Sequence, residues 1–589
     1  MKRPTKLARF LVWRKHHISD YQFIIFLSIV IGILAGFGAV IIKNLVNLIH
    51  RFLSSVTSPD VSYLYILYPM LGILLVILFV KYINKHPVRH GIPSVLYAIS
   101  KTNGIMKPHN LYSSIITSAL TVGFGGSVGL EGPSVATGAA IGSNIGRLLR
   151  FNYKQVILLL GCACAGAMSA IFKAPIAAIV FALEVIMFDL TMSAIVPLLI
   201  SSATAAFVSY LYLGQSSLYS FEIHEGLMLN QVWFFVILGI IAGLVSVYFT
   251  KMYMVITDFF DGIKDMYSRL LIGGIGLGIL VFFIPSLFGE GYSAINECLR
   301  GDISYLFENT LYPGLENSVI AVLILFLIVI FFKVIATSIT FGSGGVGGVF
   351  APTLFTGANV GLLFAKFLNI LGFNLNESSF ALIGMAGMIA GVIHAPLTAI
   401  FLIAEITGGY ELFFPLMIVA AISYATVRIF VSNSVYTLQL ARRGELITHH
   451  KDKAMLMMMK IRDLIETDFN IVHPDEKMRE LINVISHSHR NIFPVVESDN
   501  TFRGIVKMDD IRHIMFNPEM YDNVYVRDLM FMPEQIIDPS DTMEEIAKKF
   551  EISNRYNIVV IDKGKYMGFI SRAKLYSSYR KLMEDFSEH

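Results

Sequence analysis

The strongest indication of the architecture is the motif pair Gly129-Leu-Glu-Gly-Pro133 and Gly166-Ala-Met-Ser-Ala-Ile-Phe-Lys-Ala-Pro175, followed by an apolar run that ends at Glu184. The pair recurs as Gly347-Gly-Val-Phe-Ala-Pro352 and Gly387-Met-Ile-Ala-Gly-Val-Ile-His-Ala-Pro396, followed by an apolar run that ends at Glu405. Pro133 and Pro175 are 42 residues apart, and Pro352 and Pro396 are 44 apart. Glycine and proline breaks at corresponding places in two apolar halves indicate broken membrane helices around a central ion site.

Composition places most of the chain in a membrane. Only 15% of its 589 residues are charged, and its mean hydropathy is +0.65. Runs such as 23–40, 63–80 and 319–335 are long enough to cross a hydrocarbon layer of ~30 Å. Segments such as 155–170 and 379–391 are shorter or broken by glycine, so their free backbone groups must be buried in protein or line an aqueous cavity. This distribution favours a transport protein over a simple anchor.

Basic residues flank the apolar part of the chain at both ends. They are Lys2, Arg3, Lys6, Arg9, Arg14 and Lys15 before the first acid, and Arg442, Arg443, Lys451 and Lys453 after the last apolar run. By the positive-inside rule, we expect an integral protein of the plasma or inner cell membrane with both termini in the cytoplasm. The three cysteines form no disulfide framework, and we expect no metal site.

The chain divides into a membrane part and a soluble part. Beyond about residue 460 a short α/β unit occurs twice, with predicted strands at 491–496 and 557–561. The predicted divisions are a cytoplasmic segment 1–20, a membrane domain 21–441 with halves of about 21–215 and 230–441, a linker 442–459, and two small domains at 460–519 and 524–580.

Glu131 is the leading candidate for a functional residue in the membrane. It lies between Gly129 and Gly132-Pro133, where glycine frees the backbone and proline suits the first turn of a helix. An acid at membrane depth is costly and is therefore a functional candidate by default. Its carboxylate would compete with a small anion for the positive start of the helix, and would move aside when protonated. A purely structural capping role is the alternative.

Two further glycine–proline breaks precede apolar helices, at His90-Gly-Ile-Pro93 and at Gly344-Gly-Val-Gly-Gly-Val-Phe-Ala-Pro352. Together with the break at Glu131 they give three helix starts. Such starts supply partial positive charge without a full cation that would trap an ion, so they suit a chloride site. Close helix packing explains any one of these glycine clusters equally well.

These residues resemble the CLC family of chloride channels and chloride/proton antiporters, over essentially the whole chain. The segments that carry the resemblance are 129–133, 347–352 and 434–443, and the duplicated C-terminal unit resembles a pair of CBS domains. The resemblance implies an all-α polytopic membrane protein of the inverted-repeat fold, followed by a cytoplasmic α/β CBS pair. It further implies a homodimer in the lipid bilayer with one pore per subunit.

The resemblance also implies roles for particular residues. Glu131 would be the gate, the backbones of Val349 and Phe350 would hold the central anion, the Tyr436 hydroxyl would donate to it, and the Gly132 backbone would serve an outer site. Where the family often has serine at the central site, this chain has His90, which either donates to the anion or packs. The expected partners are chloride and other small anions, without nucleic acid.

The inner end of the expected pathway departs from the family pattern. Antiporters of the family generally place a second acid directly after the residue that matches Glu184, and this chain has Val185 there. The polar partners of that acid correspond to Leu96 and Ser114. Glu184 is then expected to satisfy helix ends, and the sequence favours a glutamate-gated chloride channel, with chloride/proton antiport as the alternative.

The CBS pair keeps only part of the pattern that binds adenine nucleotides. The first repeat keeps the acid Asp510 but has Lys507 for the hydroxyl, and the second keeps Ser571 but has Lys574 for the acid. A module without ligand is therefore favoured over a nucleotide site made by Asp510 and Ser571. No zinc-protease, paired-aspartate or serine–histidine pattern occurs in the spans, so we expect no enzyme and no required cofactor.

Overall fold

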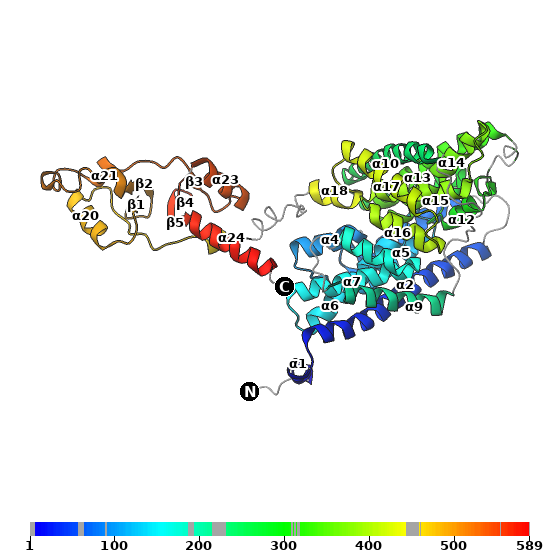
Figure 1. Cartoon of the computed structure of the whole chain (residues 1–589), viewed down its shortest axis with the longest axis horizontal. Helices are drawn as coiled ribbons and strands as arrows, with labels where there is room; N and C mark the ends of the chain where they lie inside the picture. The colour runs from blue at the N-terminus through cyan, green and yellow to red at the C-terminus, as the bar shows by residue number, and fades with distance from the viewer. Residues whose placement is uncertain are drawn as a thin grey trace. The chain divides into compact units, whose positions relative to one another are not determined.

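The computed structural model describes residues 6–56, 64–88, 91–186, 194–214, 231–307, 310, 314, 318–442, 459, 461–553 and 555–587. The chain forms two compact units, Met1–Leu446 and Ile447–His589, which we describe separately (Figure 1). His90, one of the predicted anion contacts, lies outside the described residues.

The described part of the first unit is helical. Nine helical segments in it are long and apolar enough to cross a membrane. The helices are α1 (Lys6–His17), α2 (Asp20–Val56), α3 (Leu64–Leu78) with η1 (Phe79–Asn84), α4 (Gly91–Lys101), α5 (Asn110–Gly123), α6 (Glu131–Leu148), α7 (Tyr153–Phe172), α8 (Pro175–Phe181) with η2 (Ala182–Ile186), α9 (Ile195–Leu213), α10 (Val232–Asp261), α11 (Met266–Phe283), η5 (Pro285–Leu287), α12 (Tyr292–Leu299), η6 (Ser304–Leu306), α13 (Val319–Gly342), α14 (Phe350–Ile370), α15 (Glu377–Val392), α16 (Pro396–Thr407), α17 (Phe413–Phe430) and α18 (Val435–Arg442).

The two halves of this unit pack in the same way. In the first half α2 packs on α7 and α9, and α6 packs on α7; in the second α10 packs on α15 and α17, and α14 packs on α15 (Figure 1). Lys173 and His394, which precede the two Ala-Pro pairs, both have left-handed backbones, with φ of 57° and 60°. The duplicated motif therefore corresponds to a duplicated arrangement of helices.

Reciprocal contacts between α8 and α16 show that one half is inverted relative to the other. Glu184, after the end of α8, accepts hydrogen bonds from the backbone N–H groups of Leu397 and Thr398 at 3.1 and 2.8 Å, at the start of α16. Glu405, near the end of α16, accepts from Ile176 and Ala177 at 3.0 and 2.9 Å, at the start of α8. Since each helix meets the other's start with its end, the two are antiparallel. The expected inverted-repeat fold is confirmed.

Small residues allow close contact between the central helices. In the α14–α15 contact, a Cβ on Gly357 would lie 2.6 Å from the Cα of Met385, and a Cβ on Gly384 would lie 2.9 Å from the Cα of Gly361. In the α6–α7 contact, a Cβ on Gly138 would lie 2.5 Å from the carbonyl oxygen of Ala163. Helices in lipid associate through such packing, because lipid tails are as apolar as the side chains.

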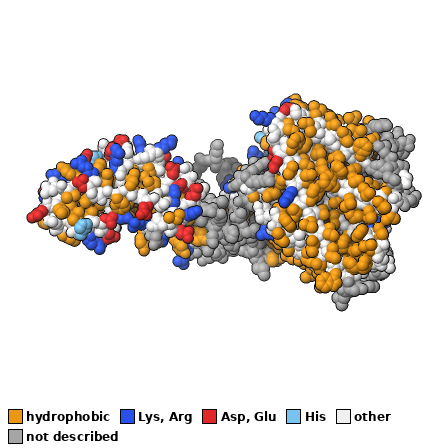
Figure 2. Space-filling model, turned by 90° about the horizontal axis from the view of Figure 1, so that it is seen from above, with side chains coloured by type: hydrophobic (Ala, Val, Ile, Leu, Met, Phe, Trp, Pro, Cys, Tyr) orange, Lys and Arg blue, Asp and Glu red, His pale blue; other side chains and the backbone are white. Residues whose placement is uncertain are grey.

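Large apolar side chains are exposed on the outer helices of this unit. Trp233, Ile320 and Ile429 are 76%, 71% and 78% exposed. Figure 2 shows hydrophobic side chains covering much of the visible face of this unit, with few charges among them. A surface of this kind and extent suits contact with lipid.

The second unit contains the two small α/β repeats (Figure 1), and the strands predicted from the sequence are confirmed. Strand β1 pairs with β2 in antiparallel fashion, while β4 pairs with β3 in parallel and with β5 in antiparallel fashion. The elements are η8 (Ile461–Asp463), α20 (Met478–His487), β1 (Ile492–Val496), β2 (Phe502–Lys507), α21 (Met508–Ile511), η9 (Pro518–Met520), α22 (Val526–Leu529), β3 (Ile536–Ile537), α23 (Met543–Ser553), β4 (Asn557–Asp562), β5 (Lys565–Ser571) and α24 (Arg572–Ser587). Phe502, Val559 and Phe569 belong to one apolar cluster that joins the repeats.

Candidate anion-binding site

Two helix starts from opposite halves meet in the middle of the membrane unit. Gly129, just before α6, donates to the carbonyl oxygen of Gly348 at 2.8 Å, and Gly348, just before α14, donates to the carbonyl oxygen of Gly129 at 2.7 Å. These two hydrogen bonds pair backbone N–H and C=O groups of the two loops, and they hold the starts of α6 and α14 against each other. The two copies of the repeated motif therefore build one site.

The start of α4 joins them, and only glycine permits this approach. A Cβ on Gly91, the first residue of α4, would lie 2.6 Å from the carbonyl carbon of Gly132. A Cβ on Gly348 would lie 2.8 Å from the backbone nitrogen of Gly132. Real Cβ atoms do not come so near to backbone atoms, so any side chain at these positions would force the helix starts apart.

A small cavity of about 20 Å³ lies where the three starts meet. Its lining includes Gly91, Gly132, Val349, Tyr253 and Tyr436. A volume of ~15 Å³ is enough for one water molecule, so this cavity suits one water molecule or one small ion. Its described lining carries no full charge, and the helix starts direct partial positive charge toward it. An anion can be held there without being trapped.

Tyr436, on α18, lines this cavity. The side chain is only 4% exposed, and its hydroxyl oxygen has no hydrogen-bond partner among the described residues. A buried hydroxyl without a partner is costly, because it has lost its bonds to water. An anion in the cavity would remove that cost by accepting a hydrogen bond from the hydroxyl.

Of the predicted anion contacts, Gly132, Val349 and Tyr436 line the cavity together. Phe350 begins α14 and is fully buried, with its ring centroid 5.2 Å from that of Phe172. Its side chain thus packs, and only its backbone belongs to the helix start.

Glu131 is the first residue of α6 and is fully buried. Its Oε1 accepts a short hydrogen bond from the Tyr292 hydroxyl, and its Oε2 has no hydrogen-bond partner among the described residues. A Cβ on Gly348 would lie 3.3 Å from that Oε2. The carboxylate therefore lies against the loop at Gly348, which lines the cavity, and there it can compete with an anion for the same helix starts.

Sequence reasoning missed the partners of Glu131. Tyr292 and Glu290 belong to the stretch Gly289-Glu-Gly-Tyr292, and Glu290 Oε1 accepts from the backbone N–H of Leu130 at 3.2 Å. The signal was available, since Glu290 is an acid flanked by glycines in an apolar region, as Glu131 is.

The inner acid has a structural role, as predicted. In addition to two backbone N–H groups, Glu184 accepts a hydrogen bond of 2.7 Å from the Thr398 hydroxyl. Val185 and Leu96 are buried apolar residues, 7% and 2% exposed. They cannot carry a proton.

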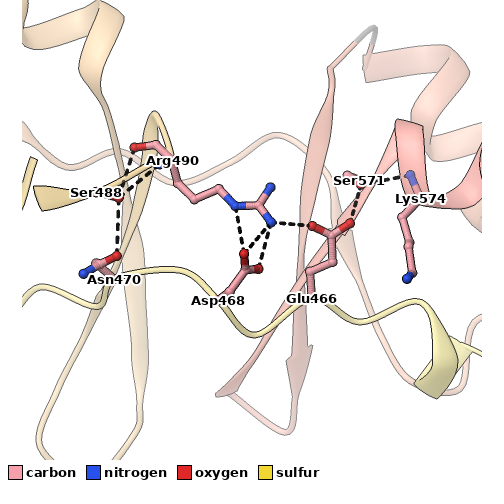
Figure 3. Close-up of polar contacts among 7 residues, drawn as sticks. All are labelled: Glu466, Asp468, Asn470, Ser488, Arg490, Ser571 and Lys574. Atoms are coloured by element: carbon pink, nitrogen blue, oxygen red, sulfur yellow. Dashed lines mark hydrogen bonds and ion pairs between the residues drawn. The ribbon is translucent and has the colours of Figure 1, made fainter.

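The CBS residues proposed for nucleotide contact are already engaged or lie at the surface. In Figure 3 the Ser571 hydroxyl donates to Glu466 at 2.6 Å and accepts from the backbone N–H of Lys574 at 3.0 Å. Glu466 in turn pairs with Arg490 at 2.8 Å. A phosphate approaching Ser571 would meet a carboxylate. Asp510 is exposed on α21.

Arg490 links two acids in this network. It contacts Asp468 at 2.7 Å as well as Glu466 (Figure 3). Hydrogen bonding to the Arg490 guanidinium lowers the pKa of Asp468. Within the described residues, no group of three or more His, Cys, Asp or Glu could hold a metal ion.

Comparison with known proteins identifies the family. The model described as "Voltage gated chloride channel" matches residues 71–428, and the CBS domain model matches 461–517 and 526–580. A putative chloride channel protein, ClcB-like, from Ralstonia nicotianae is 32% identical over 64% of this chain and 86% of its own length. The H(+)/Cl(-) exchange transporter ClcA of Vibrio vulnificus is 27% identical over 72% of this chain and 91% of its own length.

Solved structures share the fold. A slow cyanobacterial Cl-/H+ antiporter superposes with a TM-score of 0.62 at 23% identity, covering 71% of this chain and 97% of that structure. A eukaryotic CLC transporter superposes with a TM-score of 0.59 at 17% identity, covering 94% of this chain and 97% of that one. The resemblance seen in the sequence is confirmed: the chain belongs to the CLC family of voltage-gated chloride channels and transporters, with a C-terminal pair of CBS domains.

Proposed function

We propose that the chain exchanges chloride for protons across the membrane, with Glu131 both closing the anion path and carrying the proton. The observation that carries this proposal is the position of the Glu131 carboxylate, which is fully buried against the loop at Gly348 beside a cavity built by three helix starts. An ionised carboxylate and a chloride ion compete for the same partial positive charge. Protonation removes the carboxylate from that competition and couples proton movement to anion movement.

Relatives support exchange more strongly than the channel that the sequence favours. The Vibrio relative is named an H(+)/Cl(-) exchange transporter, and the cyanobacterial structure is a Cl-/H+ antiporter. We therefore place exchange ahead of conduction without protons.

A chloride channel is the second candidate, and a specific observation favours it. At the inner end of α8, Glu184 is tied to the start of α16 and is followed by buried Val185. Protons that reach Glu131 from this side therefore need water or another group.

The remaining expectations from the sequence form part of the same proposal. The protein would be a homodimer with one pore per subunit, both termini in the cytoplasm, and the CBS pair as a regulatory module. An adenine nucleotide at Asp510 and Ser571 would have to displace Glu466 from the Ser571 hydroxyl. His90 remains a candidate anion contact.

The test is a flux measurement on purified protein in liposomes. A chloride gradient is imposed, and chloride and proton movements are recorded together. Exchange predicts that the wild type drives protons against their gradient, and that Glu131→Gln keeps chloride flux but moves no protons. Glu411→Gln, an exposed acid between α16 and α17, serves as the control and should behave as wild type. Chloride flux without proton movement in the wild type would establish the channel instead.

A further inference from the structure

We propose that Glu290 transfers protons between a wide cavity and Glu131, whose carboxyl group is held by the Tyr292 hydroxyl, a role that rests on the proposed function. The wide cavity has a volume of about 480 Å³ and is lined in part by His50, Tyr65, Glu290 and Tyr292. It is separate from the small cavity at the three helix starts. It lies at the end of α2 and the start of α3.

The wide cavity lies toward the far side of the membrane from the N-terminus. Helix α2 begins at Asp20 and its span continues for 36 residues, which at ~1.5 Å per residue crosses the bilayer. His50 and Ser54, near its end, line the cavity. With a cytoplasmic N-terminus, this cavity opens on the outer side.

The Glu131 side chain does not line the wide cavity. Its side chain is fully buried, whereas Glu290 and Tyr292 are partly exposed and line the cavity. Both also contact the start of α6: the Tyr292 hydroxyl donates to Glu131, and Glu290 accepts from the N–H of Leu130 at 3.2 Å. A proton that moves between the cavity and Glu131 therefore meets these two side chains first.

Two lysines, Lys333 fully buried and Lys43 half-buried, interact with the acids of this cluster. Lys333, on α13, is fully buried; its Nζ donates to the carbonyl oxygen of Gly289 at 3.2 Å and lies 4.6 Å from the ring centroid of Phe355. Lys43, on α2, donates to the carbonyl oxygen of Ile171 at 2.6 Å. Glu290 interacts electrostatically with both lysines and with Glu131.

The charges of this cluster favour a shared proton. Two acids that interact at close range in a low-dielectric interior do not ionise independently, and titrate as a pair. In the transfer, the carboxylic acid of Glu290 loses its proton to the carboxylate of Glu131. The negative charge then lies on Glu290, where the ammonium groups of Lys43 and Lys333 offset it. Water in the wide cavity returns a proton to Glu290.

Other titratable groups also face Glu290. Among the described residues they are Glu131 on α6, Lys43 and His50 on α2, Glu297 on α12 and Lys333 on α13. The tyrosines of the wide cavity are Tyr65 and Tyr68 on α3, Tyr292 on α12 and Tyr305 on η6. Of the acids among them, Glu131 adjoins the start of α6, as Glu290 itself does.

Apart from a role in proton transfer, Glu290 accepts the hydrogen bond from the Leu130 N–H, and its charge interacts with Lys43 and Lys333. Glu290→Gln preserves that bond, because the amide oxygen can still accept, but it removes the proton that the carboxyl group exchanges. Glu290→Asp restores an ionisable group. Glu297→Gln removes another acid from the same cavity and serves as the matched control.

The experiment records chloride and proton fluxes of the full-length protein in liposomes over a series of bath pH values. We expect Glu290→Gln to slow proton transport by about tenfold or more and to flatten its response to bath pH. Glu290→Asp should restore part of the rate, and Glu297→Gln should match wild type. Chloride binding, measured by calorimetry, should be unchanged in Glu290→Gln, because Glu290 does not line the small cavity.

The outcomes separate the two proposals. If the wild type moves no protons, the proposal of chloride/proton exchange is wrong. The proton relay through Glu290 is then tested by the response of chloride flux to bath pH, because that response still depends on protonation of Glu131. Loss of that response in Glu290→Gln supports the relay. Wild-type rates and an unchanged pH response in Glu290→Gln overturn it, whichever transport mode the wild type has. Equal losses in Glu290→Gln and Glu290→Asp would also overturn it, since they would indicate a packing role.

Discussion

Tyr436→Phe is expected to weaken chloride binding and, without chloride, to stabilise the protein. Tyr436 lines the small cavity, and the variant removes its buried hydroxyl, which has no hydrogen-bond partner among the described residues. Since no bond within the described protein competes for that hydroxyl, its full hydrogen bond to a bound anion is lost. Hydrogen bonds to charged groups are worth about 1.5–3 kcal/mol, which corresponds to roughly 10- to 150-fold in the dissociation constant.

The assay pairs calorimetric titration of chloride with thermal unfolding in chloride-free and chloride-containing buffer. Without chloride the phenylalanine variant should be more stable by about 1 kcal/mol, because an unpartnered buried hydroxyl has been removed. Chloride stabilises the folded state in proportion to its binding, so the gain on adding chloride should be smaller than in wild type.

A matched variant controls for the loss of a tyrosine hydroxyl as such. The Tyr248 hydroxyl donates to the carbonyl oxygen of Phe331 at 2.9 Å, away from the cavity. Tyr248→Phe should leave the dissociation constant for chloride unchanged. The reasoning is refuted if Tyr436→Phe binds chloride as tightly as wild type, or if both variants weaken binding equally.

Three further predictions concern other parts of the structure. Glu184→Ala, which removes three hydrogen bonds to the start of α16, should lower the free energy of unfolding by about 2–4 kcal/mol and leave the chloride-to-proton ratio intact; a changed ratio would make Glu184 a proton carrier. Gly91→Ala should reduce anion flux by about tenfold or more, because its Cβ would lie 2.6 Å from the carbonyl carbon of Gly132; normal flux would mean that α4 can shift without cost. Arg490→Ala should destabilise the CBS unit at neutral pH, seen as faster hydrogen exchange there. The pKa of Asp468 is lowered in the folded state by its hydrogen bond with Arg490. The ion pair therefore stabilises the folded CBS unit above the ordinary carboxyl pKa, and this stabilisation is lost as the pH falls through the lowered pKa. The difference from wild type should therefore vanish in acid, and a difference that persists there would exclude the ion pair as its cause.

The repeated glycine–proline motif was enough to predict the site's framework. Two helix starts can approach each other closely only where the backbone has glycine. Gly132 and Gly348 therefore identify two such starts in the sequence. Because the breaks occur at corresponding positions, the meeting of two halves follows from symmetry. Glu184 and Glu405 end matching apolar runs in the two halves, and each accepts hydrogen bonds from a helix start of the other half. Their matching positions in the repeat are visible in the sequence.

Contacts outside the repeated motif could not be predicted from it. Tyr292 reaches Glu131 across 161 positions of sequence, and no periodicity specifies which aromatic residue will do so. In the CBS pair, Ser571 meets Glu466 across 105 positions. Motif spacing identified Ser571 as the hydroxyl of a nucleotide-binding pattern, but it could not show that tertiary packing places a carboxylate against that hydroxyl.

The most direct test of the account is a crystal structure of the protein soaked in bromide, located by its anomalous scattering. The account predicts a bromide peak in the small cavity, within hydrogen-bonding distance of the Tyr436 hydroxyl and of a backbone N–H at the start of α14. Bromide bound only elsewhere in the membrane unit, with this cavity empty at saturating concentration, would contradict it.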